Sequence, residues 1–298
     1  MPPLLRDSHG RLRNGWWILL FIAVFLASRL VYHPLSKAMQ SHGLDGAWLA
    51  PLPAIFVLLV TWVCMRVRKQ PLADVGLALG GRWLRHALFG IVFGGITMGV
   101  VASCIAAAGG VRFHLDPAHG MMALAIGAWS FAGVALFEEL LFRGFVFQRL
   151  VSGVGPWVAL IAMGLLFATG HWDNPGMHGA TLAWATVELF LGAVLLGLAY
   201  LRTRSLAMPV GIHLGWNWTL GHLLGFDVSG FGQTGWFHPL LQDRPEWVTG
   251  GTFGPEASIF AVVVDVLLIV VLWRWKGAPQ QPIAGDVPAR VAEVAARK

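Results

Sequence analysis

Long runs of apolar residues, separated by short polar segments, make up most of this chain. A helix needs about 20 apolar residues to cross the hydrocarbon core of a bilayer, because each residue advances it by about 1.5 Å. Eight segments approach or exceed this length, and the fourth is long enough to project beyond the bilayer as one helix. The predicted spans are residues 16–33, 48–66, 86–108, 120–150, 156–172, 181–201, 206–224 and 257–275.

The composition agrees with a membrane protein. Of 298 residues, 56% are hydrophobic and only 12% are charged. Soluble domains carry about 25% charged residues, and they need polar side chains to cover their surface. These values exclude a soluble globular enzyme, a disordered chain and a fibrous repeat. We therefore predict an all-α, polytopic membrane protein with about eight transmembrane helices.

The basic residues are unevenly distributed between the predicted loops. Cytoplasmic loops of membrane proteins carry an excess of Lys and Arg. If the N-terminus lies inside, 17 of the 21 basic residues fall in inner segments and three in outer loops, with Arg29 left near the end of the first span. We therefore expect both termini in the cytoplasm. The composition of the loops and tail resembles that of bacterial proteins, so we expect a bacterial inner membrane. The inner residues are Arg6, Arg11, Arg13, Arg66, Arg68, Lys69, Arg82, Arg85, Arg143, Arg149, Arg202, Arg204, Arg274, Lys276, Arg290, Arg297 and Lys298, and the outer ones Lys37, Arg112 and Arg244.

The basic clusters also bear on the expected partners. A net charge of +6 would be compatible with nucleic-acid binding. The positive charges, however, lie in short clusters between apolar runs, where they orient a chain in a membrane. We expect the lipid bilayer and a membrane-associated protein or peptide as partners, and no nucleic acid.

The fourth predicted span contains three charged residues close together. Charged side chains inside a span are costly and indicate a functional site. Glu139 and Arg143 are four residues apart, so they share a helix face and can form an ion pair. Glu138 is rotated by about 100° from Glu139 and points elsewhere. An ion pair that only fixes helix packing would explain Glu139 and Arg143 but not Glu138.

A histidine in the fifth span is predicted to lie near Glu138. The two spans are joined by a turn at residues 152–156; Glu138 is sixteen residues before Val154, and His171 is sixteen residues after Gly155. In an antiparallel hairpin the two side chains would therefore be level. A long fourth helix would let the hairpin tip protrude into the cytoplasm, so that both residues could meet the seventh span.

The seventh span contributes His213 and Asn217, which are four residues apart and share a face. Gly211, Gly215 and Gly221 would let neighbouring helices approach closely. His222 is about half a turn out of phase and should face away from this site.

Two more acidic residues lie within predicted spans. Glu188 and Asp265 have no charged partner at helical spacing. We interpret both as residues that join helices through hydrogen bonds.

These side chains allow two routes to hydrolysis. No Ser or Cys lies in a matching pattern, so a covalent nucleophile has no candidate. In the first route Glu138 is the general base for water, assisted by His171, while His213 and Asn217 stabilise the oxyanion. In the second, His171, His213 and Glu138 hold a zinc ion, although the zinc motif HExxH is absent.

Three motifs occur in order: Glu138-Glu139-x-x-x-Arg143, Phe167-x-x-x-His171 and His213-x-x-x-Asn217. Together they resemble the CPBP family of intramembrane proteases, which contains the type II CAAX prenyl proteases and the bacteriocin-processing Abi proteins. The resemblance implies a multi-spanning helical fold and peptide-bond hydrolysis near the membrane surface. It implies that Glu138 activates water with help from His171. It further implies that Glu139 and Arg143 shape the site and that His213 and Asn217 stabilise the oxyanion. The metal-dependent and metal-free routes both stay open.

We divide the chain into an N-terminal three-helix membrane region (1–118), a CPBP-like catalytic core (119–225), and an outer loop with the last helix and a cytoplasmic tail (226–298). The favoured function is an endopeptidase acting on prenylated CAAX-type or leader-peptide substrates. The alternatives are a non-proteolytic immunity or scaffold protein of the same fold, and a transporter. Transporters are often built from paired half-repeats with broken helices, and the sequence shows no such repeat.

Overall fold

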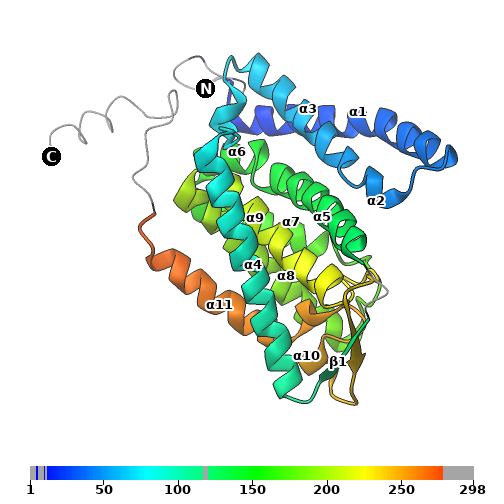
Figure 1. Cartoon of the computed structure of the whole chain (residues 1–298). Helices are drawn as coiled ribbons and strands as arrows, with labels where there is room; N and C mark the ends of the chain where they lie inside the picture. Colours follow the sequence, from blue (N-terminus) through cyan, green and yellow to red (C-terminus); the bar gives the residue numbers. More distant parts are fainter. Residues whose placement is uncertain (1–4, 6–9, 11, 117–119, 278–298) are drawn as a thin grey trace.

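The computed structural model describes residues 5, 10, 12–116 and 120–277, and these residues are mostly helical (Figure 1). The predicted tail beyond residue 277 lies outside the described residues, as do Arg6, Arg11, Arg290, Arg297 and Lys298. The α-helices are α1 (Asn14–Ser41), α2 (Gly46–Leu49), α3 (Leu52–Val67), α4 (Gly81–Ala107), α5 (Met121–Phe142), α6 (Phe145–Val154), α7 (Pro156–Thr169), α8 (Gly179–Thr203), α9 (Ala207–Trp218), α10 (Glu246–Thr249) and α11 (Ile259–Arg274). Single turns are η1 (Leu72–Val75), the π-helical η2 (Thr219–Leu223) and η3 (Pro255–Ala257).

In the described part of the chain, five helical segments are long and apolar enough to cross a membrane. They are α1, α2 with α3, α4, α5 with α6, and α8. The other three predicted spans are also helical but shorter: α7 has 14 residues, α9 has 12 and α11 has 16. The chain is therefore a helical, polytopic membrane protein, while the count of eight spans stays a prediction.

Apolar side chains cover the outer faces of these helices. On α4, Phe89, Val92 and Ile96 are all about 60% exposed and lie on one face. The short α7 does the same with Val158 and Ile161, which are 54% and 53% exposed. Large contiguous apolar patches are rare on soluble monomers, whereas lipid tails solvate them without cost. The outward face of α7 therefore favours a place for this short helix in the bilayer.

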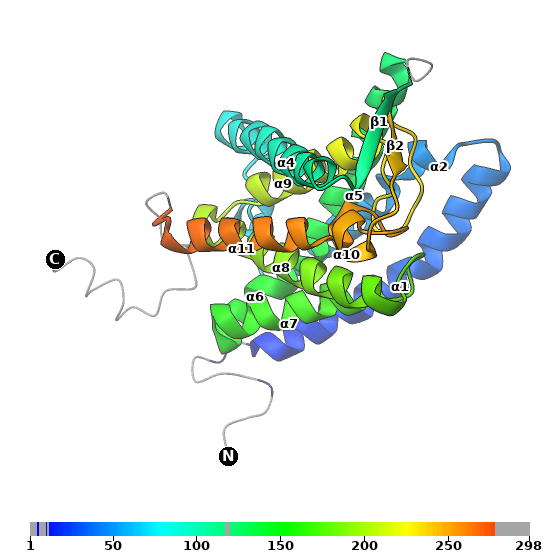
Figure 2. The same cartoon turned by 90° about the horizontal axis from the view of Figure 1, so that it is seen from below.

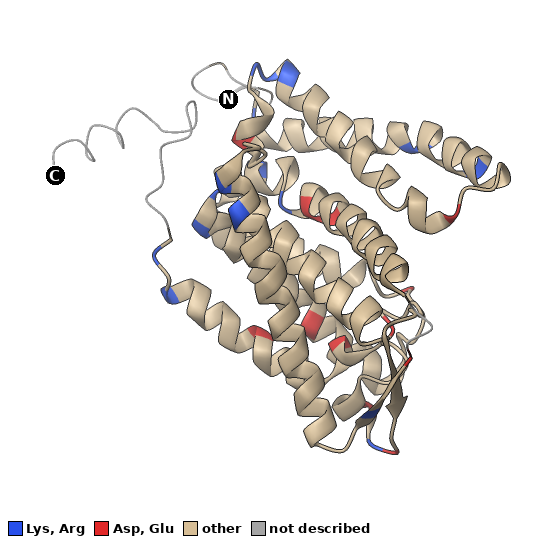
Figure 3. Cartoon of the chain, in the orientation of Figure 1, with Lys and Arg blue, Asp and Glu red and all other residues tan. Residues whose placement is uncertain are grey.

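Most of the described basic residues gather at one end of the helices, where α3, α8 and α11 end and α4 begins, while a few lie on α1 and beside the sheet at the other end (Figure 3). This arrangement agrees with the predicted inner face. The opposite end carries a two-stranded antiparallel sheet, which the all-α prediction did not include. Its strands are β1 (Val111–Leu115) and β2 (Phe237–Leu241), paired so that Val111 faces Leu241. Two predicted outer loops, far apart in the sequence, are joined by these backbone hydrogen bonds.

The fourth predicted span is wrong in one respect, because it is broken. Helix α5 ends at Phe142, and α6 starts at Phe145 after a turn at Arg143 and Gly144. A Cβ at position 144 would overlap the carbonyl oxygen of Leu140. A glycine there permits the turn, and the break lies directly after the acidic motif.

The helices that carry the motifs pack in one bundle with α4, α8 and α11. Helix α9 packs against α4 on one side and α5 on the other. Helix α8 lies between α7 and α11 when the molecule is seen from below (Figure 2). Residues from α5, α7, α8, α9 and α11 therefore reach a common interior.

The seam between α4 and α9 is built from glycines. A Cβ on Gly90 or Gly94 of α4 would overlap the backbone of α9 near Met208 and Ile212. The converse holds for Gly211, where a Cβ would overlap the carbonyl of α4 residue 87. The predicted close approach is therefore confirmed, and α9, which carries His213, has little freedom to shift against α4.

Replacing Gly94 by Ala is expected to destabilise the protein by about 1–3 kcal/mol, because the added methyl group must force two backbones apart. The matched control is Gly99→Ala on the same helix, where nothing lies within 4 Å of the added Cβ. Unfolding in mixed detergent micelles measures both variants. Equal stability of the two variants would show that the seam is not closely packed.

Candidate active site

The acidic motif lies at the C-terminal end of α5, where Glu138 lines a cavity. Glu139 is fully buried, and its Oε1 accepts a hydrogen bond from Nη1 of Arg143 at 3.1 Å. The predicted ion pair between these residues is thus confirmed. Nη2 of Arg143 donates to the backbone oxygen of Ala193 on α8 at 2.9 Å. The guanidinium therefore ties α5 to α8 as well as neutralising Glu139.

His213 lies between the two glutamates. Its Nδ1 is 2.9 Å from Oε1 of Glu139, and its Nε2 is 3.6 Å from Oε2 of Glu138. An ionised carboxylate only accepts hydrogen bonds, so Nδ1 carries the hydrogen in the contact with Glu139. Glu139 thereby fixes the ring orientation and presents Nε2 to Glu138.

Glu138 differs from its neighbour in exposure. Its side chain is 17% exposed, whereas that of Glu139 is 0% exposed. It lines the cavity, as expected for a residue on a different helix face. The ion pair that Glu138 makes is with His213 and not with His171, the partner suggested by the hairpin count.

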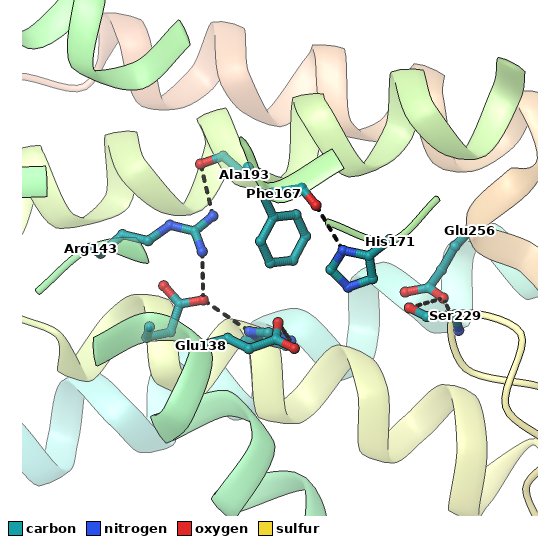
Figure 4. A network of polar contacts seen from close by, with 9 residues as sticks. Glu138, Arg143, Phe167, His171, Ala193, Ser229 and Glu256 are labelled. Atoms are coloured by element: carbon teal, nitrogen blue, oxygen red, sulfur yellow. Dashed lines mark hydrogen bonds and ion pairs between the residues drawn. The ribbon is translucent and has the colours of Figure 1, made fainter. Parts of the chain in front are cut away.

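His171 lies just beyond the end of α7, in the turn after Gly170. Its Nδ1 is 2.8 Å from the backbone oxygen of Phe167, the first residue of the same motif. A carbonyl oxygen can only accept, so Nδ1 is the donor and Nε2 is left as the acceptor in the neutral ring. Figure 4 shows the ring of Phe167 between Arg143 and His171. Arg143 lies over that ring at 5.3 Å from its centre.

Asn217 lies one turn after His213 on α9. Both side chains are buried and line the cavity, so the predicted shared face is confirmed. Among the described residues, none forms a hydrogen bond with the side-chain amide of Asn217. Two amide N–H groups are therefore available to a ligand. His222, in contrast, packs against Phe131 at a ring distance of 5.4 Å and does not line the cavity.

The cavity has a volume of about 360 Å³. Its walls are mostly apolar, from side chains on α5, α8 and α9, with the polar groups of the motifs among them. A space that is apolar with a few convergent polar groups is typical of a site for an organic ligand. The principal apolar residues are Phe131, Val134, Leu189, Leu195, Ile212 and Trp216.

Three acidic residues on the cavity wall were not assigned to the site from sequence. Glu188 and Asp265 were predicted to join helices through hydrogen bonds, which is wrong: Oε2 of Glu188 and Oδ2 of Asp265 have no partner in the described part of the chain. Glu256, in η3, lies just before the last predicted span, so its position did not indicate a buried carboxyl group. Its Oε2 accepts hydrogen bonds from the N–H and hydroxyl of Ser229. Burial raises the pKa of Glu256, and the bonds from Ser229 oppose that shift.

The sequence that forms this site resembles a known protein family. Residues 120–219 match the family described as type II CAAX prenyl endopeptidase, Rce1-like. The chain carries an Rce1-like domain. This confirms the resemblance to the CPBP family and supports a membrane-embedded protease of the CAAX type. No curated protein and no solved structure matches the chain.

The Rce1-like domain begins just before α5 and ends in the first turn after α9. It contains all three motifs, and each contributes side chains to the lining of one cavity: Glu138, Phe167 with His171, and His213 with Asn217. Glu256 and Asp265 lie beyond it, on the segments that follow. The wall of the cavity is therefore completed by a part of the chain outside the matched residues.

Proposed function

We propose that the chain is an intramembrane endopeptidase in which Glu138 activates the attacking water. The observation that supports this most directly is that Glu138, His171, His213 and Asn217 line one cavity. The four residues come from α5, the turn after α7, and α9, and their titratable groups are buried or half-buried. A carboxylate that lines a cavity shared with two imidazoles and an amide is placed to act as the general base for a bound water.

The proposed reaction proceeds in two steps. Glu138 takes a proton from water, and the oxygen attacks the carbonyl carbon of the scissile bond. The imidazolium form of His213, whose Nε2 also carries a proton, and Asn217 stabilise the oxyanion that forms, since donors preorganised in a buried site stabilise developing charge strongly. The C–N bond then breaks, and the proton held by Glu138 passes to the departing amine, with His171 assisting proton transfer through Nε2.

Glu139 and Arg143 act through His213 in this scheme. Glu139 holds Nδ1 of His213, and Arg143 neutralises Glu139 and anchors it to α8. Without these contacts the imidazole ring could rotate away from Glu138. We regard both as positioning residues.

Zinc binding by His171, His213 and Glu138 stays a prediction. Among residues 5, 10, 12–116 and 120–277, no three His, Cys, Asp or Glu side chains come together as metal ligands. The residues as placed do not fit a zinc site, so the steps above are written without a metal. Chelation of active protein, followed by zinc add-back, decides between the two routes.

The proposed substrate is a membrane-associated protein or peptide, either a prenylated CAAX-type C-terminus or a leader peptide, cut in the bacterial inner membrane. The test uses the purified full chain in liposomes, a farnesylated C-terminal peptide and a leader-peptide library, with products identified by mass spectrometry. We expect cleavage of one of the two classes. If neither is cut, a non-proteolytic immunity or scaffold role is favoured.

Replacing Asn217 by Ala is expected to lower kcat by about 10²–10³-fold, because one donor to the oxyanion is removed. KM should change little, since the oxyanion exists only in the transition state and intermediate. Steady-state kinetics on the cleaved peptide measures both values, with Gln242→Ala as a control that removes an amide outside the cavity. A raised KM with unchanged kcat would show that Asn217 binds substrate instead.

A further inference from the structure

One wall of the cavity is acidic and takes no part in the proposed reaction. Glu188 on α8, Glu256 on η3 and Asp265 on α11 all line it. They are 5%, 5% and 1% exposed, respectively. No Lys or Arg lines the cavity in the described part of the chain. Three carboxyl groups therefore face one interior whose described lining holds the imidazoles of His171 and His213 but no Lys or Arg.

Two of these groups are left without hydrogen bonds. Glu256 is held by Ser229. Oε2 of Glu188 and Oδ2 of Asp265, however, are buried and have no partner among the described residues. Buried polar atoms are normally satisfied, and an uncompensated buried charge is costly. Both oxygen atoms therefore lack a hydrogen-bond donor, and a bound ligand could supply one.

Gly192 defines the space that such a ligand would occupy. It lies one turn after Glu188 on α8 and lines the cavity. A Cβ built on Gly192 would be 3.4 Å from Oδ2 of Asp265 and 3.9 Å from Oε1 of Glu188. The two carboxyl groups thus border the same small space, which is kept open by the absent side chain.

The chemistry of this space favours an organic cation over a metal ion. The described residues hold no group of three or more potential ligands in metal-binding positions. Two carboxyl groups suit the several N–H donors of a guanidinium or ammonium. The neighbouring Leu189, Leu195 and Leu196 are apolar and suit the aliphatic stem of a long basic side chain.

We propose that Glu188 and Asp265 form a subsite that binds a Lys or Arg side chain of the substrate peptide. The cation lies between the two carboxyl groups, in the space next to Gly192. This inference rests on the proposed peptidase function and names a feature of its substrates. A peptide whose scissile bond lies at Glu138 would place a nearby basic residue against α8 and α11. The subsite would select such peptides over neutral ones.

The first test measures substrate preference. A peptide that the wild type cleaves is prepared with Arg, Lys, norleucine or citrulline at each position flanking the scissile bond. At one position we expect kcat/KM to favour Arg or Lys over the neutral residues by about tenfold or more. In Glu188→Gln/Asp265→Asn this ratio should fall close to one, whereas Asp243→Asn, on the exposed surface, should keep it. No preference in the wild type, or a preference retained in the double variant, overturns the proposal.

Gly192→Ala is a second variant that keeps both carboxyl groups. Its Cβ would make ordinary van der Waals contacts, so the fold should be retained, and Ala is the better helix former. The methyl group would nevertheless occupy the space where the cation binds. We expect a reduced preference for Arg with unchanged or increased thermal stability. A preference that survives Gly192→Ala contradicts the proposed position of the cation.

The third test does not depend on proteolysis. Binding of n-butylguanidinium to the full-length Glu138→Gln variant is measured by calorimetry, with n-butylurea as the neutral analogue. We expect the guanidinium to bind, and its binding to be lost when Glu188→Gln and Asp265→Asn are added. Binding without any peptide cleavage by the wild type would reject the peptidase function and keep the cation site. Absence of guanidinium binding, or its replacement by Ca²⁺ or Zn²⁺ binding at the same two residues, rejects the cation site itself.

Discussion

Glu138→Gln is expected to lower kcat by about 10²–10⁴-fold, the contribution typical of a general base. Gln has nearly the same shape but cannot accept the proton from water. The contact of Glu138 with Nε2 of His213, at 3.6 Å, is longer than a hydrogen bond, so the change should leave the contacts of Glu139 and Arg143 intact. The fold and KM should therefore change little. Initial rates on the cleaved peptide, together with thermal unfolding of each variant, measure the effect.

The matched control for this experiment is Glu246→Gln, the same chemical change on α10, outside the cavity. It should keep wild-type rates, although it weakens the bond from the hydroxyl of Thr181. Unchanged cleavage by Glu138→Gln would reject Glu138 as the base. Equal losses in both glutamine variants would point to a general effect on the protein.

Arg143→Met is expected to lower the free energy of unfolding by about 3–5 kcal/mol, because it leaves a buried carboxylate without its cation. The side chain of Arg143 is 2% exposed, and its bonds to Glu139 and to Ala193 join α5 to α8. Met fills much of the same volume without supplying a charge. Unfolding in mixed detergent micelles gives the free energy, and activity should fall as well, because Glu139 positions His213.

A double variant separates the charge effect from lost packing. The double variant Arg143→Met/Glu139→Gln removes both charges of the buried ion pair, so no carboxylate is left without its cation. It should therefore be more stable than the single variant Arg143→Met. Arg82→Met, an exposed position at the start of α4, should be near wild type. If removing Glu139 as well does not restore stability, the cost of Arg143→Met comes from its packing against Phe167 and its bond to α8.

Relations within one helix were predictable. The pairing of Glu139 with Arg143 and the shared face of His213 and Asn217 follow from four-residue spacing, which helical geometry alone enforces. The glycines of α9 likewise indicated a close helix neighbour, and α4 takes that place. These predictions are confirmed because each depends on a regular repeat of about 3.6 residues.

Relations between helices were not predictable in the same way. Residue counting across the turn at 152–156 suggested Glu138 opposite His171. Both residues line the cavity in the structure, although Gly144 breaks the helix that the count assumed to be continuous. In the structure His213 lies between both glutamates, because the glycine seam with α4 sets the position of α9 beside α5.

The pattern of apolar and charged residues was sufficient to predict a membrane protein, the three motifs and the family to which residues 120–219 are matched. It could not reveal the acidic wall. Glu188, Glu256 and Asp265 belong to three elements that are distant in sequence, and none has a charged neighbour along its own helix. Their convergence on one cavity depends on how α8, α11 and η3 pack. Burial and the lack of a partner are properties of that packing, because a side chain is desolvated by what surrounds it in space and not by its neighbours in the chain.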